Sequence, residues 1–268
     1  MKPQKPTPDS RPGKKVRPVF NKRKPATVIS DADSEIRLNR YIANSGVCSR
    51  READELIRSG NIRVNGVVVT EMGHRVKKSD RVHFKNKLLS PEKNVYLLLN
   101  KPTGFITTTD DPQERKTVMQ LVSKACPERI YPVGRLDRNT TGLLLFTNDG
   151  ALSKKLTHPS HGVSKVYRAD LDKALDPQHL EQIRRGIDLE DGRAEVDAIE
   201  LLPPGRTSVG IELHMGKNRI VRRIFEFLGY EVIKLDRVAY AGLTKKDLPR
   251  GKWRMLSRQE VIALKHLI

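Results

Sequence analysis

Cysteine is scarce in this sequence, and no apolar run in it is long enough to cross a membrane. The 268 residues include two cysteines, Cys48 and Cys126, without a CxxC pair or a His/Cys cluster at metal-ligand spacing. We therefore expect neither a disulfide framework nor a metal site, and a reducing, cytoplasmic location. No stretch of about 18 apolar residues occurs, and the charged N-terminus lacks the apolar core of a secretory signal. We expect no membrane association.

The common cofactor motifs are also missing. The sequence contains no GxxxxGK[ST] phosphate loop, no GxGxxG, no GxSxG and no HExxH. These absences argue against a bound nucleotide, a nicotinamide or a metal. Any catalysis is therefore expected to depend on ordinary side chains, without a cofactor.

Positive charge, in contrast, is abundant. The chain has 51 Lys and Arg against 32 Asp and Glu, a formal net charge of +19. The first 34 residues hold nine Lys/Arg and three Asp, which leaves +13 on the remaining 234 residues. The excess therefore belongs to the folded body as well as to its N-terminus, and it favours a polyanionic partner. The alternative is a solvated surface with a high isoelectric point.

Residues 1–34 are rich in Pro, Lys and Arg and poor in aromatic side chains. They contain six prolines and one aromatic residue, Phe20. Such a segment buries too little apolar area to offset its ordering entropy, so we expect a disordered basic tail. The tail either adds non-specific phosphate contacts or is simply solvated.

Residues 35–83 have the pattern of a small α+β domain. Leu38 and Ile42 recur at helical spacing. Ser49 with Glu52 forms a capping box for a second helix, and an Asn-Gly pair after it predicts a tight hairpin. Residues 84–94 are then expected to form a linker to a larger domain at 95–268.

The stretch RLNRYIANSGVCSRREADELIRSGNIRVNG resembles an S4 RNA-binding domain over its full length. The resemblance implies RNA binding and leaves the chemistry open, because S4 domains occur in proteins of several functions. The basic residues expected to contact RNA are Arg37, Arg40, Arg50, Arg51, Arg58 and Arg63.

Strands outnumber helices in residues 95–268, and there is no regular βαβ alternation. This pattern predicts an α+β domain with a mostly antiparallel, mixed sheet and peripheral helices. Its strands are expected at 95–99, 143–146, 166–171, 196–202, 209–213 and 231–235. Its helices are expected at 117–124, between Asp176 and Gly186, at 218–228 and after Ser257.

Three short stretches carry the candidate chemistry, and each has a plainer interpretation. GRLDRNTTG at 134–142 places an aspartate between two arginines in a glycine-bounded loop; the alternative is ordinary turn chemistry. GKNRIVRR at 216–223 opens a helix whose arginines are expected on its polar side, the alternative being a solvated face. SKVYR at 164–168 places a tyrosine on a strand, where packing is the usual role.

Together these stretches resemble the pseudouridine synthases, in the branch that couples an S4 domain to the catalytic domain (the RsuA-like group). The resemblance runs from about residue 36 to the C-terminus, with NKPTGFITTTDD, GRLDRNTTGLLLFTNDG, GKNRIVRRIFEFLGYEV and LPRGKWRMLS in the expected order. It implies that Asp137 is the catalytic carboxylate, that Tyr167 lies near the target base, and that Arg222 pairs with the aspartate. It also implies that Arg135 helps displace the base from its stack and that Val221 lines the pocket.

The implied reaction is the isomerisation of uridine to pseudouridine in ribosomal RNA. It consumes nothing, so no cofactor is implied, and the carboxylate either adds to the sugar or removes a sugar proton. Further substrate contacts are expected from Lys165, Arg138, Arg219 and Arg223. GLLLFTNDG, the triplet HPS at 158–160 and LPRGKWR favour members that modify 23S RNA. We therefore expect the pre-ribosomal large subunit as the partner of a monomeric enzyme.

Three alternatives remain open from the sequence. The first is an enzyme that modifies 16S RNA of the small subunit. The second is a non-catalytic S4-type protein that binds ribosomal RNA or assists ribosome assembly. The third is a hydrolase of N-glycosidic bonds, which needs a second carboxylate, for which Asp110 and Asp111 are the candidates.

Overall fold

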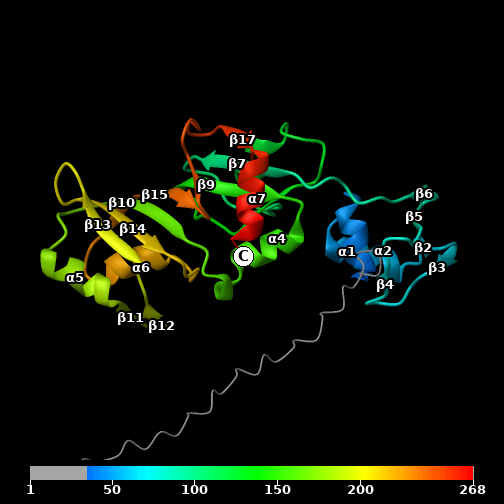
Figure 1. Cartoon of the computed structure of the whole chain (residues 1–268), viewed down its shortest axis with the longest axis horizontal. Helices are drawn as coiled ribbons and strands as arrows, with labels where there is room; N and C mark the ends of the chain where they lie inside the picture. Colours follow the sequence, from blue (N-terminus) through cyan, green and yellow to red (C-terminus); the bar gives the residue numbers. More distant parts are fainter. Residues whose placement is uncertain (1–34, 268) are drawn as a thin grey trace, which may run out of the picture.

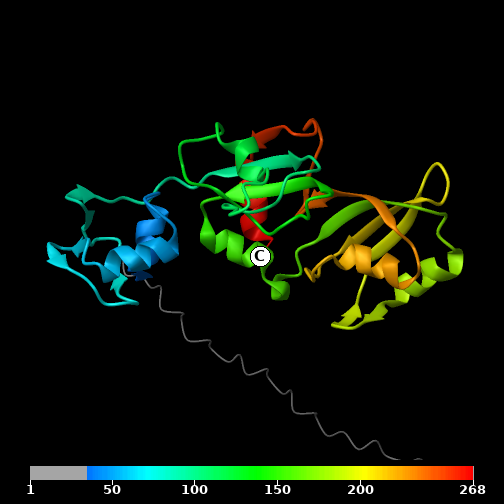
Figure 2. The same cartoon turned by 180° about the vertical axis from the view of Figure 1, so that it is seen from behind.

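The computed structural model describes residues 35–267. The basic tail expected over 1–34 lies outside the described residues. A small N-terminal module, residues 36–89, lies at one end of the long axis, and a larger domain that begins at β7 fills the rest (Figure 1). The view from behind shows the same arrangement (Figure 2). No helix in the described range is both long enough and apolar enough to cross a bilayer.

The N-terminal module combines two helices, a four-stranded sheet and a separate pair of short strands. The helices are α1 (Leu38–Asn44) and α2 (Arg50–Arg58). The sheet has the antiparallel order β3-β2-β5-β6, and β1 pairs with β4. These strands are β1 (Ile36–Arg37), β2 (Ile62–Val64), β3 (Val67–Val68), β4 (Arg75–Val76), β5 (Val82–Phe84) and β6 (Lys87–Leu88).

Local signals in the sequence account for this module. The Ser49 hydroxyl accepts from the Glu52 N–H and the Glu52 carboxylate accepts from the Ser49 N–H, so the predicted capping box is confirmed. Asn65 and Gly66 both have positive φ, as the predicted tight hairpin requires. Helices and sheet share one apolar core, in which Ile42 is fully buried.

The prediction of a linker over 84–94 is wrong for its first half. Phe84 ends β5, and β6 adds an edge strand to the sheet of the module. Leu89 is only 4% exposed and belongs to the core of the module. Lys85 and Asn86 take left-handed conformations, so the chain reverses within two residues. Because the turn is polar and the strands beside it are short, this hairpin has the amino-acid composition expected of a linker.

The larger domain contains one nine-stranded sheet. Its main path is β13-β14-β10-β15-β9-β7-β17, with β16 paired to β15 and β8 paired to β9. Every pair in it is antiparallel except β15 with β9, which confirms the predicted α+β class with a mostly antiparallel sheet. Its strands are β7 (Tyr96–Lys101), β8 (Tyr131–Pro132), β9 (Thr140–Thr147), β10 (Lys165–Leu171), β13 (Ala198–Leu202), β14 (Ser208–Leu213), β15 (Val232–Tyr240), β16 (Leu243–Thr244) and β17 (Trp253–Met255).

The remaining elements of this domain are a hairpin, several helices and a short 3-10 turn around the sheet. The hairpin joins β11 (Ile187–Leu189) to β12 (Gly192–Ala194). The helices are α3 (Val118–Val122), α4 (Gly150–Thr157), η1 (Pro159–His161), α5 (Pro177–Arg185), α6 (Ile220–Phe227) and α7 (Arg258–His266).

Strand β9 is buried on both faces, as its continuous apolar run predicts. Leu143 and Leu145 share a core with residues of α4 and α7. Leu144 and Phe146 belong to a different core, which includes residues of α3. The strand that follows the GRLD loop is therefore held from both sides, and the loop has a rigid base.

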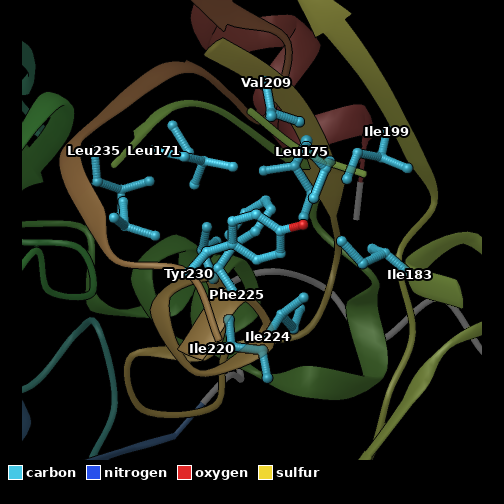
Figure 3. Packing of buried hydrophobic residues seen from close by; sticks show 14 of the residues in the cluster. Leu171, Leu175, Ile183, Ile199, Val209, Ile220, Ile224, Phe225, Tyr230 and Leu235 are labelled. Atoms are coloured by element: carbon cyan, nitrogen blue, oxygen red, sulfur yellow. The ribbon is translucent and has the colours of Figure 1, made fainter. Parts of the chain in front are cut away.

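Helix α6 packs its apolar side on the half of the sheet formed by β10, β13 and β14. Ile220, Ile224 and Phe225 lie in one core with Leu171 and Val209 (Figure 3). This packing fixes the helix that carries the predicted NRIVRR arginines against β15 and the β11–β12 hairpin.

The prediction that Arg222 lies on the polar side of α6 is wrong. Arg222 is only 9% exposed, and its Nη1 donates to the carbonyl oxygen of Val232 in β15. Burial, and then the positive charge of Arg219, lower the pKa of Arg222. A backbone carbonyl on the neighbouring strand gives this guanidinium a buried partner that helical periodicity does not reveal.

Candidate active site

A pocket of about 180 Å³ lies where β9, β10 and β15 run side by side. Tyr167 of β10 pairs with Arg237 of β15, and Arg237 pairs with Gly142 of β9. Asp137 lies in the loop before β9 and lines the same pocket. The three predicted motifs therefore meet at one place, although they are far apart in the sequence.

The backbone around Asp137 is held by a lysine that the sequence reading missed. Lys101 at the end of β7 is fully buried. Its Nζ donates to the carbonyl oxygens of Asp137 at 3.0 Å, Arg138 at 3.3 Å and Thr140 at 2.8 Å. The Pro102 carbonyl lies at 3.2 Å as well, so the three N–H groups are shared among four carbonyl oxygens. One ammonium group thus ties the turn to the end of the neighbouring strand.

The other side of the turn is held by Thr107. Its hydroxyl donates to the Leu136 carbonyl at 2.7 Å and lies 3.2 Å from the Leu136 N–H. The Asp137 side chain itself is 40% exposed and is not used to hold the loop together. The plainer interpretation of this aspartate, that it merely stabilises its own turn, is therefore not supported.

Burial of Lys101 also changes its acidity. Loss of hydration lowers its pKa to about 8, an effect that the negative charge of Asp137 opposes. The lysine contributes positive charge beneath the carboxylate as well as hydrogen bonds to its loop. Its position in NKPTG resembles an ordinary strand end, so periodicity alone does not predict this role.

The ion-pair partner of Asp137 is Arg219, at 3.9 Å between Nη1 and Oδ2. Arg219 lies immediately before α6 in a left-handed conformation, with φ 46°, so it does not follow the periodicity of the helix. Arg222 was implied to form this pair, but no ion pair within 4.0 Å joins it to Asp137. The long-range charge of the aspartate still acts on Arg222.

Lys165 and Tyr167 line the wall that β10 contributes. The Lys165 Nζ donates to the carbonyl oxygens of Val163 at 2.6 Å and His214 at 2.7 Å. Burial, followed by the positive charge of Arg237, lowers the pKa of Lys165 to about 8. Tyr167 is half-buried and packs at the meeting point of two cores.

The other predicted substrate contacts divide into two groups. Arg135 and Val221 line the pocket. Arg138 is exposed outside the pocket lining, and Arg223 pairs with Asp191 at 2.7 Å. Because Asp191 holds it, Arg223 is directed toward the β11–β12 hairpin and not toward the pocket.

Asp137 is the sole carboxylate among the described residues that line this pocket. Asp111, a candidate second acid for a hydrolase, is tied to Arg115 at 2.6 Å, and this bond lowers its pKa to about 2. Neither Asp110 nor Asp111 lines the pocket. In residues 35–267 no group of three His, Cys, Asp or Glu is placed to hold a metal ion. The pocket thus offers one carboxylate among several cations.

A second, larger hollow of about 910 Å³ lies between the N-terminal module and the larger domain. Of the six predicted RNA contacts, Arg37, Arg40 and Arg50 line it, opposite Lys154 and Lys155 of α4. The other three lie elsewhere on the module: Arg51, Arg58 and Arg63 are exposed, and Arg58 pairs with Glu55. The six arginines therefore do not all line the hollow.

Comparison with known proteins identifies both parts of the chain. Residues 95–227 match the RNA pseudouridylate synthase family model, and residues 36–82 match the S4 domain model. A ribosomal large subunit pseudouridine synthase B from Bacillus subtilis (strain 168) is 44% identical over 236 residues, which cover 86% of this chain and 96% of the relative. The dual-specificity RNA pseudouridine synthase RluF from Escherichia coli (strain K12) is 36% identical over 239 residues, which cover 88% of this chain and 80% of the relative.

A solved structure agrees with these relatives. A crystal structure of a pseudouridylate synthase superimposes with a TM-score of 0.61 at 28% sequence identity, covering 85% of this chain and 99% of that one. The chain therefore belongs to the family of RNA pseudouridine synthases.

Proposed function

We propose that this enzyme isomerises a uridine of 23S ribosomal RNA to pseudouridine, with Asp137 as its essential carboxylate. One observation carries the proposal: the loop of Asp137 is fixed by Lys101 and Thr107, while the carboxylate itself takes no part in holding the loop and lines a pocket with Tyr167. A fixed loop with an accessible acid is suited to chemistry, because the acid meets its substrate without reorganising.

The reaction follows from these groups. The target uridine leaves its stack and enters the pocket, which costs a few kcal/mol. Asp137 either adds to C1′ of the sugar or removes a sugar proton, and in both cases the C1′–N1 bond breaks. The uracil then turns, and C5 bonds to C1′. Tyr167 is placed on the β10 wall to stack on the free base.

Arg219, 3.9 Å from the Asp137 carboxylate, and the buried Lys101, which donates to the Asp137 carbonyl oxygen, place positive charge beside the proposed catalytic group. The cations around the pocket also suit the phosphates on either side of the target uridine.

The RNA target is inferred from the module and from the relatives. Arg37, Arg40 and Arg50 face Lys154 and Lys155 across the hollow between the two parts, which suits a double-stranded or looped RNA backbone. The name of the Bacillus subtilis relative, a large-subunit enzyme, supports 23S RNA as the substrate. We further propose that the enzyme acts in the cytoplasm, as a monomer, on precursors of the large subunit.

The test uses purified full-length protein with transcripts of 23S and 16S RNA. The products are digested to nucleosides, and pseudouridine and free uracil are measured separately. We expect pseudouridine from 23S RNA, none from 16S RNA, and no free uracil. Free uracil without pseudouridine would support an N-glycosidic hydrolase instead, and RNA binding without any product would support a non-catalytic binding protein.

A further inference from the structure

Arg237 is a buried cation of the pocket, and the reaction described above assigns it no role. The residue is only 3% exposed, yet it lines the pocket. Its Nη2 has no hydrogen-bond partner in the described structure, and the same holds for the hydroxyl of Thr140, a second buried residue of the pocket lining. Buried polar groups are rarely left unpaired, because an unpaired group has lost its hydration without gaining a hydrogen bond in return.

The Arg237 guanidinium is held in place from two sides. Its Nε donates to the Leu143 carbonyl of β9 at 2.8 Å. Its central carbon lies 4.5 Å from the centre of the Tyr240 ring, so the ring supports the guanidinium plane. The strands approach so closely here that a Cβ on Gly142 would lie 2.2 Å from the Arg237 carbonyl oxygen. The arginine is thus oriented before any ligand arrives.

No carboxylate among the described residues forms an ion pair with Arg237. The adjacent Asp236 pairs instead with Lys245 and Arg250, and it is absent from the pocket lining. A second cation of the pocket, Lys165, also lies within reach of the Arg237 charge: burial, and then the charge of Arg237, lower the pKa of Lys165. A buried, uncompensated positive charge is costly, and a ligand that accepts hydrogen bonds or carries negative charge would relieve the cost.

We propose that Arg237 donates a hydrogen bond to a carbonyl oxygen of the target uracil and stabilises the negative charge that this ring carries once it is detached. The inference rests on the proposed function. Phosphates of the RNA strand are a less suitable ligand, because they stay outside with the backbone while only the base is extruded into the pocket. The exposed Arg135 and Arg138 are available to phosphates instead.

The charge on the uracil follows from the balance of the reaction. When the C1′–N1 bond breaks, its electron pair leaves with the ring and spreads over N1, O2 and O4. When C5 later bonds to C1′, C5 gives up its proton and N1 takes one. Between these steps the ring is anionic, and a fixed guanidinium stabilises such a charge more strongly than it stabilises the neutral base.

The symmetry of uracil lets one arginine serve before and after the turn. Rotation about the axis through N3 and C6 exchanges N1 with C5, and it also exchanges O2 with O4. A donor that holds one carbonyl oxygen in the bound uridine therefore holds the other in the turned base. The Thr140 hydroxyl can accept or donate, so it can pair with the N3–H group or with a carbonyl oxygen.

The same geometry selects uracil against cytosine. A guanidinium has donors and no acceptor. Cytosine presents an amino donor where uracil presents O4. A donor facing a donor in a buried pocket leaves both unpaired, so cytidine at the target position should be disfavoured either when it is bound or once its base has turned.

The experiment uses full-length enzyme and the RNA fragment that wild type modifies, with 4-thiouridine or 2-thiouridine at the target position. Sulfur is a weaker acceptor than oxygen, so each substitution should slow the wild-type single-turnover rate by about tenfold. Arg237→Met should react about 10²-fold more slowly than wild type on unmodified RNA, with nearly unchanged RNA affinity, and should show no further loss with either thio substrate. Lys245→Met, which removes a cation from the neighbouring Asp236 and does not line the pocket, is the matched control and should react like wild type.

The outcomes separate the inference from the proposed function. Wild type that makes no pseudouridine refutes the proposed function, whatever the variants do. An active wild type together with a fully active Arg237→Met, or with thio effects that persist undiminished in that variant, overturns the role of Arg237. If thermal unfolding shows that Arg237→Met does not fold, Arg237→Lys replaces it. Arg237→Lys keeps a positive charge but lacks the planar set of guanidinium donors. A slower rate with altered thio effects supports the inference, and wild-type rates and thio effects overturn it.

Discussion

Lys101 Nζ lies 3.0 Å from the carbonyl oxygen of Asp137, so a buried ammonium holds the loop whose side chain is proposed to do the chemistry. Lys101→Met keeps a similar apolar stem and leaves the loop carbonyls without their donor. We expect kcat to fall by at least about tenfold, the effect of 1.36 kcal/mol on the barrier, with a smaller change in KM. Lys252→Met, at an exposed lysine, is the control for loss of charge. Equal kinetics for both variants would contradict the role of Lys101.

Deprotonation of Lys101 at alkaline pH should lower kcat and raise the free energy of unfolding. Burial lowers the pKa of Lys101 to about 8 from its ordinary value of 10.5. Above about pH 8 the folded protein loses this proton and a loop donor, so kcat should decline on the alkaline side. Between about pH 8 and pH 10.5 the unfolded chain still binds the proton that the folded protein has lost, so the contribution of this lysine to the free energy of unfolding rises with pH. Below pH 8 both states are protonated, and the cost of burying the charge is fully present.

The measurement compares wild type with Lys101→Met in kcat against pH and in urea unfolding against pH. Lys165, whose pKa is also lowered to about 8, contributes to the same alkaline limb, so Lys165→Met is run in parallel. An alkaline decline of the same size in wild type and in both variants would show that neither lysine is responsible.

Arg219 and Arg222 should fail in different ways when each is replaced by alanine. Arg219 is 45% exposed and pairs with Asp137, so Arg219→Ala should lower kcat by about tenfold and change the free energy of unfolding by less than about 1 kcal/mol. Arg222 is buried against the Val232 carbonyl, so Arg222→Ala should destabilise the fold by roughly 2–4 kcal/mol. Denaturant unfolding and steady-state kinetics on both variants decide this. A stable but inactive Arg222→Ala would instead support the pairing of Arg222 with Asp137 that the family resemblance implied.

Arginines of the N-terminal module that line the hollow should differ in RNA binding from those that do not. Arg50 lines the hollow opposite α4, whereas Arg58 pairs with Glu55 on the exposed side of α2. Arg50→Glu should weaken RNA affinity and reduce the slope of log K against log salt by about 1, with kcat nearly unchanged. Arg58→Glu is the matched control on the same helix and should have a smaller effect. Identical salt slopes for the two variants would argue that RNA does not enter the hollow.

Gly142 is required by the approach of β9 to β15. A Cβ there would lie 2.2 Å from the carbonyl oxygen and 2.5 Å from the nitrogen of Arg237, both backbone atoms that cannot move aside easily. Gly142 also has φ of 108°, which an alanine rarely adopts. Gly142→Ala should therefore destabilise the fold by about 3 kcal/mol or more. Gly216→Ala, where a Cβ meets open space, should change the free energy of unfolding little, and equal unfolding midpoints would contradict this account.

Local signals made much of the fold predictable. The capping boxes of α2 and α7, the apolar run of β9 and the start of α5 after Asp176 all lie within a few residues of the atoms that stabilise them. The hairpin at 84–89 escaped prediction because its turn is polar and its strands are two or three residues long.

The cations that surround Asp137 were harder to predict, because their partners are distant in the sequence. Lys101 is buried by carbonyl oxygens more than 30 residues away, and a lysine at a strand end normally indicates exposure. The strand expected to end at Leu235 continues to Tyr240, since Asp236 and Arg237 find partners in β9 across the sheet, the Thr141 hydroxyl and the Leu143 carbonyl. Charged residues interrupt the apolar pattern there, so only the tertiary structure reveals that β15 passes through the pocket.

The most direct test of the central claim is pseudouridine mapping of ribosomal RNA from cells that lack this protein. The cells are then supplied with wild type or with Asp137→Asn, a near-isosteric change that removes the charge and leaves the loop contacts of the backbone intact. We predict that a pseudouridine of 23S RNA disappears without the protein, returns with wild type and stays absent with Asp137→Asn, although that variant still binds RNA. Restoration of the modification by Asp137→Asn, or persistence of every pseudouridine in its absence, would contradict the account.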